Sequence, residues 1–108
     1  IDACGSIWFQ QGWKDKVAAG FTHSLGLSGD KLNTLQGLMI NAMQHGMIWV
    51  GTGVMPEGSL PENTNRLSSY SGAMAQSNMD QQQINERDRK AAMILGQRVA
   101  TLTSRLKT

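Results

Sequence analysis

Residues 16–53 constrain the fold most, because they read in order as a strand, a loop, a helix and a second strand. The apolar runs KVAAGF at 16–21 and MIWVGTG at 47–53 do not alternate between apolar and polar residues. Such runs are typical of parallel strands that are covered on both faces. A parallel pair needs a crossover of about a dozen or more residues, and the segment between Asp30 and Gly46 provides it as a helix. The sequence therefore predicts an α/β fold with a parallel sheet.

Two helices are predicted from periodic apolar residues. The first begins near Asp30 and ends at Gly46, a residue that accepts the left-handed conformation of a helix stop. The second covers 88–107, where apolar residues recur at steps of three and four and so lie on one side of the helix. Its apolar positions are Ala92, Leu95, Val99, Leu102 and Leu106.

The remaining segments are a helix end with a tryptophan-containing loop at 1–14 and a long, turn-rich loop at 54–87. Ligands of open parallel sheets bind outside the carboxyl ends of the strands. The loop at 22–29 follows the first strand, and we expect the loop at 54–87 to leave the second strand at the same rim. The two loops together are predicted to form a pocket.

The composition excludes several functions. The chain has 108 residues, of which 40% are hydrophobic and 17% charged, as in a globular domain. Its net charge of +2 comes without a basic stripe, so nucleic-acid binding is not expected. The single cysteine, Cys4, excludes an intrachain disulfide and a cysteine-rich zinc site, and no metal site is predicted. No apolar stretch is long enough for a membrane span, and a cytoplasmic location is expected.

The loop at 22–29 is the first candidate site. Backbone N–H groups of a glycine-containing turn at a helix start can converge on one point and favour electron-rich groups. The alternative is that its serine and glycine residues only turn the chain and cap the helix. The residues alone leave both interpretations open.

Longer stretches resemble a known family. The segment GWKDKVAAGFTHSLGLSGDKLNTL, the segment QHGMIW, the stretch with Tyr70 and the closing helix resemble the carboxyl-terminal half of flavodoxin-like proteins. The nearest resemblance is to the tryptophan-repressor-binding-protein family of FMN-dependent NAD(P)H:quinone oxidoreductases. It implies a flavodoxin-like doubly wound parallel sheet, in which residues 1–108 supply strands four and five with their flanking helices. The chain opens on Ile1 without an initiator methionine. We therefore expect that an amino-terminal half with the FMN phosphate loop belongs to the same domain.

The resemblance also implies functional residues. The loop after strand four would pack along the flavin, and it consists here of Thr22, His23, Ser24, Leu25, Gly26 and Leu27. His45 would border the FMN and nicotinamide site as a catalytic residue, and Trp8 would line the substrate pocket. From the residues alone, His45 is better explained as a favourable residue at a helix end, and the alternative for Trp8 is a hydrophobic plug under a loop.

The implied activity is the reduction of a quinone by NAD(P)H through bound FMN. One alternative is a flavodoxin that carries single electrons and has no NAD(P)H reaction. Another is a signalling receiver domain, which needs acidic residues at strand ends that 22–29 and 52–55 lack. Because His45 and Trp8 are predicted at the rim opposite the loop, they can reach only a neighbour's flavin. We therefore expect a homo-oligomer, either a dimer or a tetramer.

Overall fold

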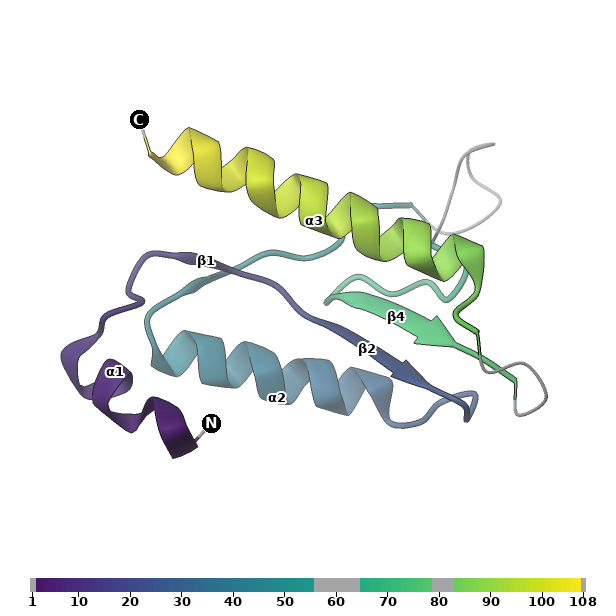
Figure 1. Cartoon of the computed structure of the whole chain (residues 1–108), viewed down its shortest axis with the longest axis horizontal. Coiled ribbons are helices and arrows are strands. Elements are labelled where there is room, and N and C mark those ends of the chain that lie inside the picture. The colour runs from purple at the N-terminus through teal and green to yellow at the C-terminus, as the bar shows by residue number, and fades with distance from the viewer. Residues whose placement is uncertain (1, 56–64, 79–82, 108) are drawn as a thin grey trace.

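The computed structural model describes residues 2–55, 65–78 and 83–107. After a short 3₁₀ helix and a short α-helix, two strands precede each of the two long helices (Figure 1). The elements are η1 (Asp2–Cys4), α1 (Gly5–Gln10), β1 (Val17–Ala18), β2 (Phe21–Ser24), α2 (Lys31–Gln44), β3 (Ile48–Trp49), β4 (Ala73–Gln76) and α3 (Glu86–Leu106).

All of the described strand pairs are parallel. β1 pairs with β3, and β2 pairs with β4 in a register that sets Phe21 opposite Ala73 and Ser24 opposite Gln76. Only Ala19 and Gly20 separate β1 from β2, so 17–24 is one extended segment with two successive partners. The first predicted strand thus reaches Ser24, three residues beyond the predicted end. A side chain at Gly20 would stand 2.9 Å from the Trp49 ring, and this crowding explains the glycine at the break.

The predicted long loop at 54–87 is wrong as a single loop, because it contains β4. β3 pairs with the first half of the segment 17–24, and after the connection 50–72, which we call the excursion, the chain pairs as β4 with the second half of the same segment. Several hydrogen bonds hold the outgoing residues 52–54 and the returning residues 65–70 together, one of them from the Thr52 hydroxyl to the Ser69 carbonyl at 2.9 Å. The Thr52 N–H donates to the Tyr70 carbonyl at 3.0 Å, and the Asn65 amide donates to the Val54 carbonyl at 3.0 Å. The turn residues expected at Pro56, Gly58 and Pro61 lie outside the described residues.

Helices cover both faces of the strands. Figure 1 shows α2 on one side of the strands and α3 on the other. Both predicted helices are confirmed within about two residues, at 31–44 and 86–106. The buried apolar side chains come from both helices and from the strand region, and they are Leu35, Ala42, Val50, Ala73 and Leu95. In the part of the chain that the structure describes, no helix is long and apolar enough to cross a membrane.

Candidate functional site

The loop after β2 begins later than predicted. Thr22, His23 and Ser24 belong to the strand, so the loop proper is 25–30. The Ser24 hydroxyl donates to the Gly26 carbonyl at 2.8 Å and closes the start of the loop. At its end Gly29 has φ +54°, and a Cβ there would collide with the Ser24 side chain. The glycine is therefore required both by the backbone conformation and by the close approach of Ser24.

Lys31 lies beneath this loop as the first residue of α2. Its side chain is buried, with 3% of the residue exposed. The ammonium donates to the Ser24 hydroxyl at 2.8 Å, to the Gly26 carbonyl at 3.2 Å and to the Leu27 carbonyl at 3.0 Å. Our sequence reasoning missed Lys31. The sequence did contain one signal for it. A positive charge in the first turn of a helix interacts unfavourably with the helix dipole, so a lysine at that position indicates another role.

His23 ties the loop strand to the segment that follows β4. Its Nε2 atom lies 2.9 Å from the Ser77 hydroxyl oxygen. The Ser77 hydroxyl donates its one proton to the Gln83 carbonyl at 2.9 Å. Ser77 can then only accept from His23, so the Nε2 atom of His23 carries a proton. The Ser77 N–H also donates to the Ser24 carbonyl at 3.2 Å, and the two segments are thereby fixed side by side at the carboxyl rim.

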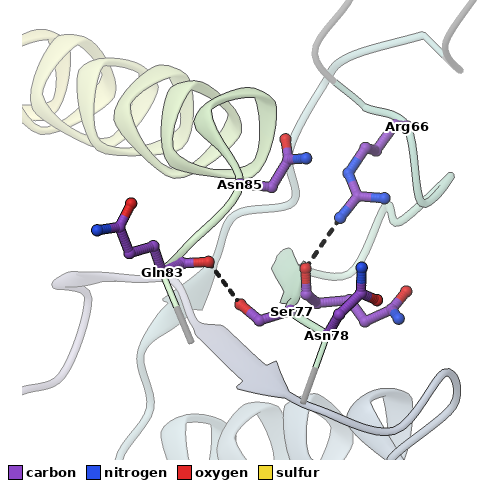
Figure 2. A pocket seen from close by; sticks show the side chains of 6 residues that line it. Arg66, Ser77, Asn78, Gln83 and Asn85 are labelled. Atoms are coloured by element: carbon purple, nitrogen blue, oxygen red, sulfur yellow. Dashed lines mark hydrogen bonds between the residues drawn. The ribbon is translucent and has the colours of Figure 1, made fainter. Parts of the chain in front are cut away.

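A polar pocket of about 120 Å³ lies at this rim, between the end of β4 and the start of α3 (Figure 2). Its lining consists of Arg66, Gln76, Ser77, Asn78, Gln83 and Asn85. The guanidinium of Arg66 pairs with the buried carboxylate of Asp88 at 2.7 Å, which neutralises its charge. The pocket therefore offers amide and hydroxyl groups rather than a free positive charge. All of these lining residues fall within the predicted 54–87 segment and none comes from 22–29, so a polar pocket shared by the two loops stays a prediction.

A second, largely apolar pocket of about 150 Å³ lies on the face of the sheet that α3 covers. Phe21, Met74 and Ile84 contribute to its wall. The side chain of Phe21 is 75% exposed beside it. The pocket borders the candidate loop through Thr22 and His23, on the strand that precedes the loop.

His45 follows the last residue of α2, at the end of the helix away from the loop, and Trp8 belongs to α1. Figure 1 shows α1 near that end of α2. The helix has 14 residues, which corresponds to about 21 Å at 1.5 Å per residue. Two hydrogen bonds hold the α1 region at that end. The Gln11 amide donates to the Gln44 carbonyl at 3.3 Å, and the Asp15 N–H donates to the Gly46 carbonyl at 2.9 Å.

His45 is buried at 3% exposure, and its ring centroid lies 4.7 Å from that of Trp13. Its Nδ1 atom has no hydrogen-bond partner among the described residues. Trp8 is half-exposed and contacts Phe9 edge-on. The structure thus brings together the loop residues of the predicted site and leaves His45 and Trp8 apart from them. The roles of these two residues stay predictions.

Comparisons with known proteins find relatives along almost the whole chain. The protein named Flavodoxin FldP from Pseudomonas aeruginosa (strain UCBPP-PA14) is 37% identical over 110 aligned residues, which cover 97% of this chain and 60% of the relative. A protein named NAD(P)H dehydrogenase (quinone) from Methylocella silvestris is 28% identical, with 99% of this chain and 54% of the relative covered. No protein-family model matches.

A solved structure is similar as well. The crystal structure of the flavodoxin, WrbA-like protein from Agrobacterium tumefaciens matches with a TM-score of 0.74 and 38% identity, over 96% of this chain and 53% of that one. The chain thus spans between half and three-fifths of the length of these proteins.

Proposed function

We propose that this chain, which belongs to the flavodoxin-like proteins related to WrbA, forms part of an FMN-dependent oxidoreductase. The proposed reaction of the complete protein is the reduction of quinones with NAD(P)H. The expected flavodoxin-like fold with parallel strands and helices is confirmed, and the chain covers about half of the similar solved structure. We assign the predicted strand four to the segment 17–24 and strand five to β3 with β4. The activity of the complete protein is our proposal. Its support is the loop at the carboxyl end of β2.

The loop fits a flavin ring in its charge and its side chains. Between Thr22 and Gly29 the sequence has no carboxylate that would repel an electron-rich ring, and the one carboxylate of the loop belongs to its last residue, Asp30. The Leu25 and Leu27 side chains are 43% and 83% exposed, and they offer apolar contact to a flat ring. The Gly26 and Leu27 carbonyls, which would repel the ring, are already bound by the Lys31 ammonium. When bound, FMN supplies two-electron redox chemistry between NAD(P)H and a quinone.

The residues of this chain hold the loop in place for that role. Ser24 and Lys31 fix its inner side by hydrogen bonds, and His23 joins it to Ser77 at the rim. The polar pocket beside it offers amide groups that suit the hydroxyl and carboxamide groups of a nicotinamide nucleotide or the carbonyl groups of a quinone. We place the substrate near this rim.

Trp8 and His45 are proposed to act on the flavin of a neighbouring subunit. Trp8 is half-exposed and can do so directly, whereas His45 is 3% exposed beneath Trp13 and can do so only if the Trp13 ring moves aside when the subunits associate. The proposal rests on their position about one helix length from the loop of their own chain. It requires a homo-oligomer, a dimer or a tetramer, in which the amino rim of one subunit meets the carboxyl rim of another.

The rival function is a flavodoxin that only carries electrons. The specific observation in its favour is that the relative named Flavodoxin FldP is 37% identical, whereas the one named NAD(P)H dehydrogenase (quinone) is 28% identical. The two functions differ in one reaction. An oxidoreductase oxidises NAD(P)H directly, and a carrier accepts electrons only from a partner protein.

The test is anaerobic stopped-flow mixing of NADPH, and separately NADH, with the FMN-loaded complete polypeptide that carries this sequence. Rapid bleaching of the oxidised flavin band, followed by recovery on addition of benzoquinone, would support the oxidoreductase. A flavin that stays oxidised with both nucleotides would favour the carrier. A polypeptide that takes up no FMN would overturn both.

The trans arrangement is tested with mixed oligomers. One subunit type carries His45→Ala and Trp8→Ala, and the other carries Gly29→Ala in the flavin loop. Sites composed of one intact loop and one intact His45 should recover part of the quinone reductase activity. If verified subunit exchange restores no activity, His45 and Trp8 act within their own subunit or not at all.

A further inference from the structure

We infer that Lys31 is a positioning residue for the flavin. It turns the peptide groups of the loop so that the Leu27 and Ser28 N–H groups bind the electron-rich edge of the ring, and it places a positive charge behind them. The inference rests on the proposed FMN site and goes beyond it, because it assigns a role to a residue outside the loop. It is independent of whether the electron acceptor is a quinone or a protein.

The direction of the N–H groups follows from the direction of the carbonyls. The carbonyl oxygens of Gly26 and Leu27 both lie within hydrogen-bond distance of the buried Lys31 ammonium. No cis peptide bond occurs among the described residues, and in a trans peptide the C=O and N–H bonds point in opposite directions. The N–H of Leu27 shares a peptide group with the Gly26 carbonyl, and the N–H of Ser28 shares one with the Leu27 carbonyl. Both N–H groups therefore point away from Lys31.

These two N–H groups have no acceptor within the described part of the chain. Leu27 and Ser28 are exposed in the loop before α2, and no hydrogen bond among the described residues uses either N–H group as donor. Two neighbouring donors on the outer side of a loop form a concave site for an electron-rich group. A flavin ring presents carbonyl oxygens at its pyrimidine edge, and that edge becomes negative on reduction.

The charge of Lys31 acts in the same direction. Its three acceptors, one hydroxyl and two carbonyls, are neutral, and the ion pairs seen among the described residues do not include it. A buried and unneutralised ammonium is poorly screened by water, so its field extends to a group bound on the other side of the loop. It favours the reduced, more negative flavin over the oxidised one.

A purely structural role of Lys31 would leave a different trace in the midpoint potential of the bound flavin. If Lys31 only satisfied the loop carbonyls, its removal would weaken binding of oxidised and reduced FMN by the same factor. The midpoint potential of the bound flavin would then stay unchanged, because the potential reports only the ratio of the two affinities. The potential therefore separates a positioning and electrostatic role from a structural one.

The first experiment compares Lys31→Met with the unchanged complete polypeptide. Methionine keeps a similar length and removes both the donors and the charge. The matched control is Lys90→Met, which removes an exposed charge from α3. We expect the preference for reduced over oxidised FMN to fall about tenfold in Lys31→Met. For a two-electron couple this lowers the midpoint potential by about 30 mV. The control should leave the potential unchanged. A potential in Lys31→Met equal to that of the control would overturn the inference.

The second experiment needs no variant, so it tests the binding of FMN by the Leu27 and Ser28 N–H groups even if Lys31→Met fails to fold. Amide NMR of the unchanged polypeptide is recorded with and without saturating FMN. The Leu27 and Ser28 amide protons should shift downfield and become protected from exchange, while amides in α3 after Leu95 should not change. If FMN saturates the protein and both loop amides stay unchanged, the inference is wrong although the proposed function stands. If no FMN binds, the proposed function fails and the inference fails with it.

Discussion

The ion pair between Arg66 and Asp88 joins three parts of the chain, and its removal gives a demanding test of the structure. Asp88 lies in the first turn of α3 and is 2% exposed. Its carboxylate accepts from Arg66 Nε at 2.8 Å, from Arg66 Nη2 at 2.7 Å and from the Gln76 N–H at 3.0 Å. It therefore connects the segment that contains Arg66, the end of β4 and the start of α3. We predict that Asp88→Asn destabilises all three connections together.

The magnitude follows from burial. Breaking a buried ion pair by removing one charge costs about 3–5 kcal/mol, because the remaining charge stays uncompensated. Since the Arg66 side chain is 22% exposed, water replaces part of the lost interaction. We therefore expect a loss near the lower limit, about 3 kcal/mol in the free energy of unfolding.

Urea denaturation of the complete polypeptide, followed by circular dichroism, measures this loss. Arg66→Met combined with Asp88→Leu removes both charges and should recover much of the stability, because apolar replacement of a buried pair is often neutral. The control is Glu86→Gln, which breaks an exposed pair in the same helical turn and should change little. An Asp88→Asn variant within about 1 kcal/mol of the unchanged protein would refute the argument from burial.

Three further outcomes are expected. Gly29→Ala should cost about 1–2 kcal/mol from its left-handed backbone alone, and more from the collision at its Cβ, with a matching loss of FMN affinity by fluorescence titration. Trp13→Ala should make His45 reactive toward diethylpyrocarbonate, as read by peptide mass spectrometry; a His45 already reactive in the unchanged protein would contradict its burial. The hydrogen bond from Arg89 holds the pKa of Glu86 below its ordinary 4.5, so this pair stabilises at neutral pH and the contribution disappears as pH falls through the lowered pKa. Between pH 5 and pH 3 the urea midpoint should therefore fall less steeply with decreasing pH in Glu86→Gln than in the unchanged protein. Equal slopes in the two proteins would show that the pair adds no stability.

The parallel unit could be predicted from the sequence because its signals are strong and local. The unbroken apolar runs and the periodic residues from Leu35 to Ala42 depend on burial, which leaves a pattern in the residue types. β4 left no such pattern. Its four residues AMAQ have little preference for a strand, and their conformation is set by hydrogen bonds to β2, which are distant in sequence.

The candidate site was predictable in its location and not in its construction. A loop after a parallel strand is a general place for a ligand, so residues 22–29 could be proposed as a candidate site from the sequence. The role of Lys31 depends on where its long side chain points, and a lysine at the start of a helix is normally assumed to be solvated. The separation of His45 from the loop was predictable, because a helix of known length lies between them. Its burial under Trp13 was not, since that contact joins two segments whose packing the sequence does not encode locally.

The excursion between β3 and β4 also bears on how such a protein can diversify. Its two arms are joined at Thr52 and Tyr70, and again at Val54 and Asn65, before the chain re-enters the sheet. The register of β4 is set by β2, and so the number of residues that connect the arms does not alter the alignment of the strands. Closing a longer connection costs little, about 0.6 kcal/mol for each doubling of its length. Insertions and deletions between the two arms would therefore leave the register of β4 and the loop after β2 unchanged, so this connection is a place where new contacts can evolve without rebuilding the candidate site.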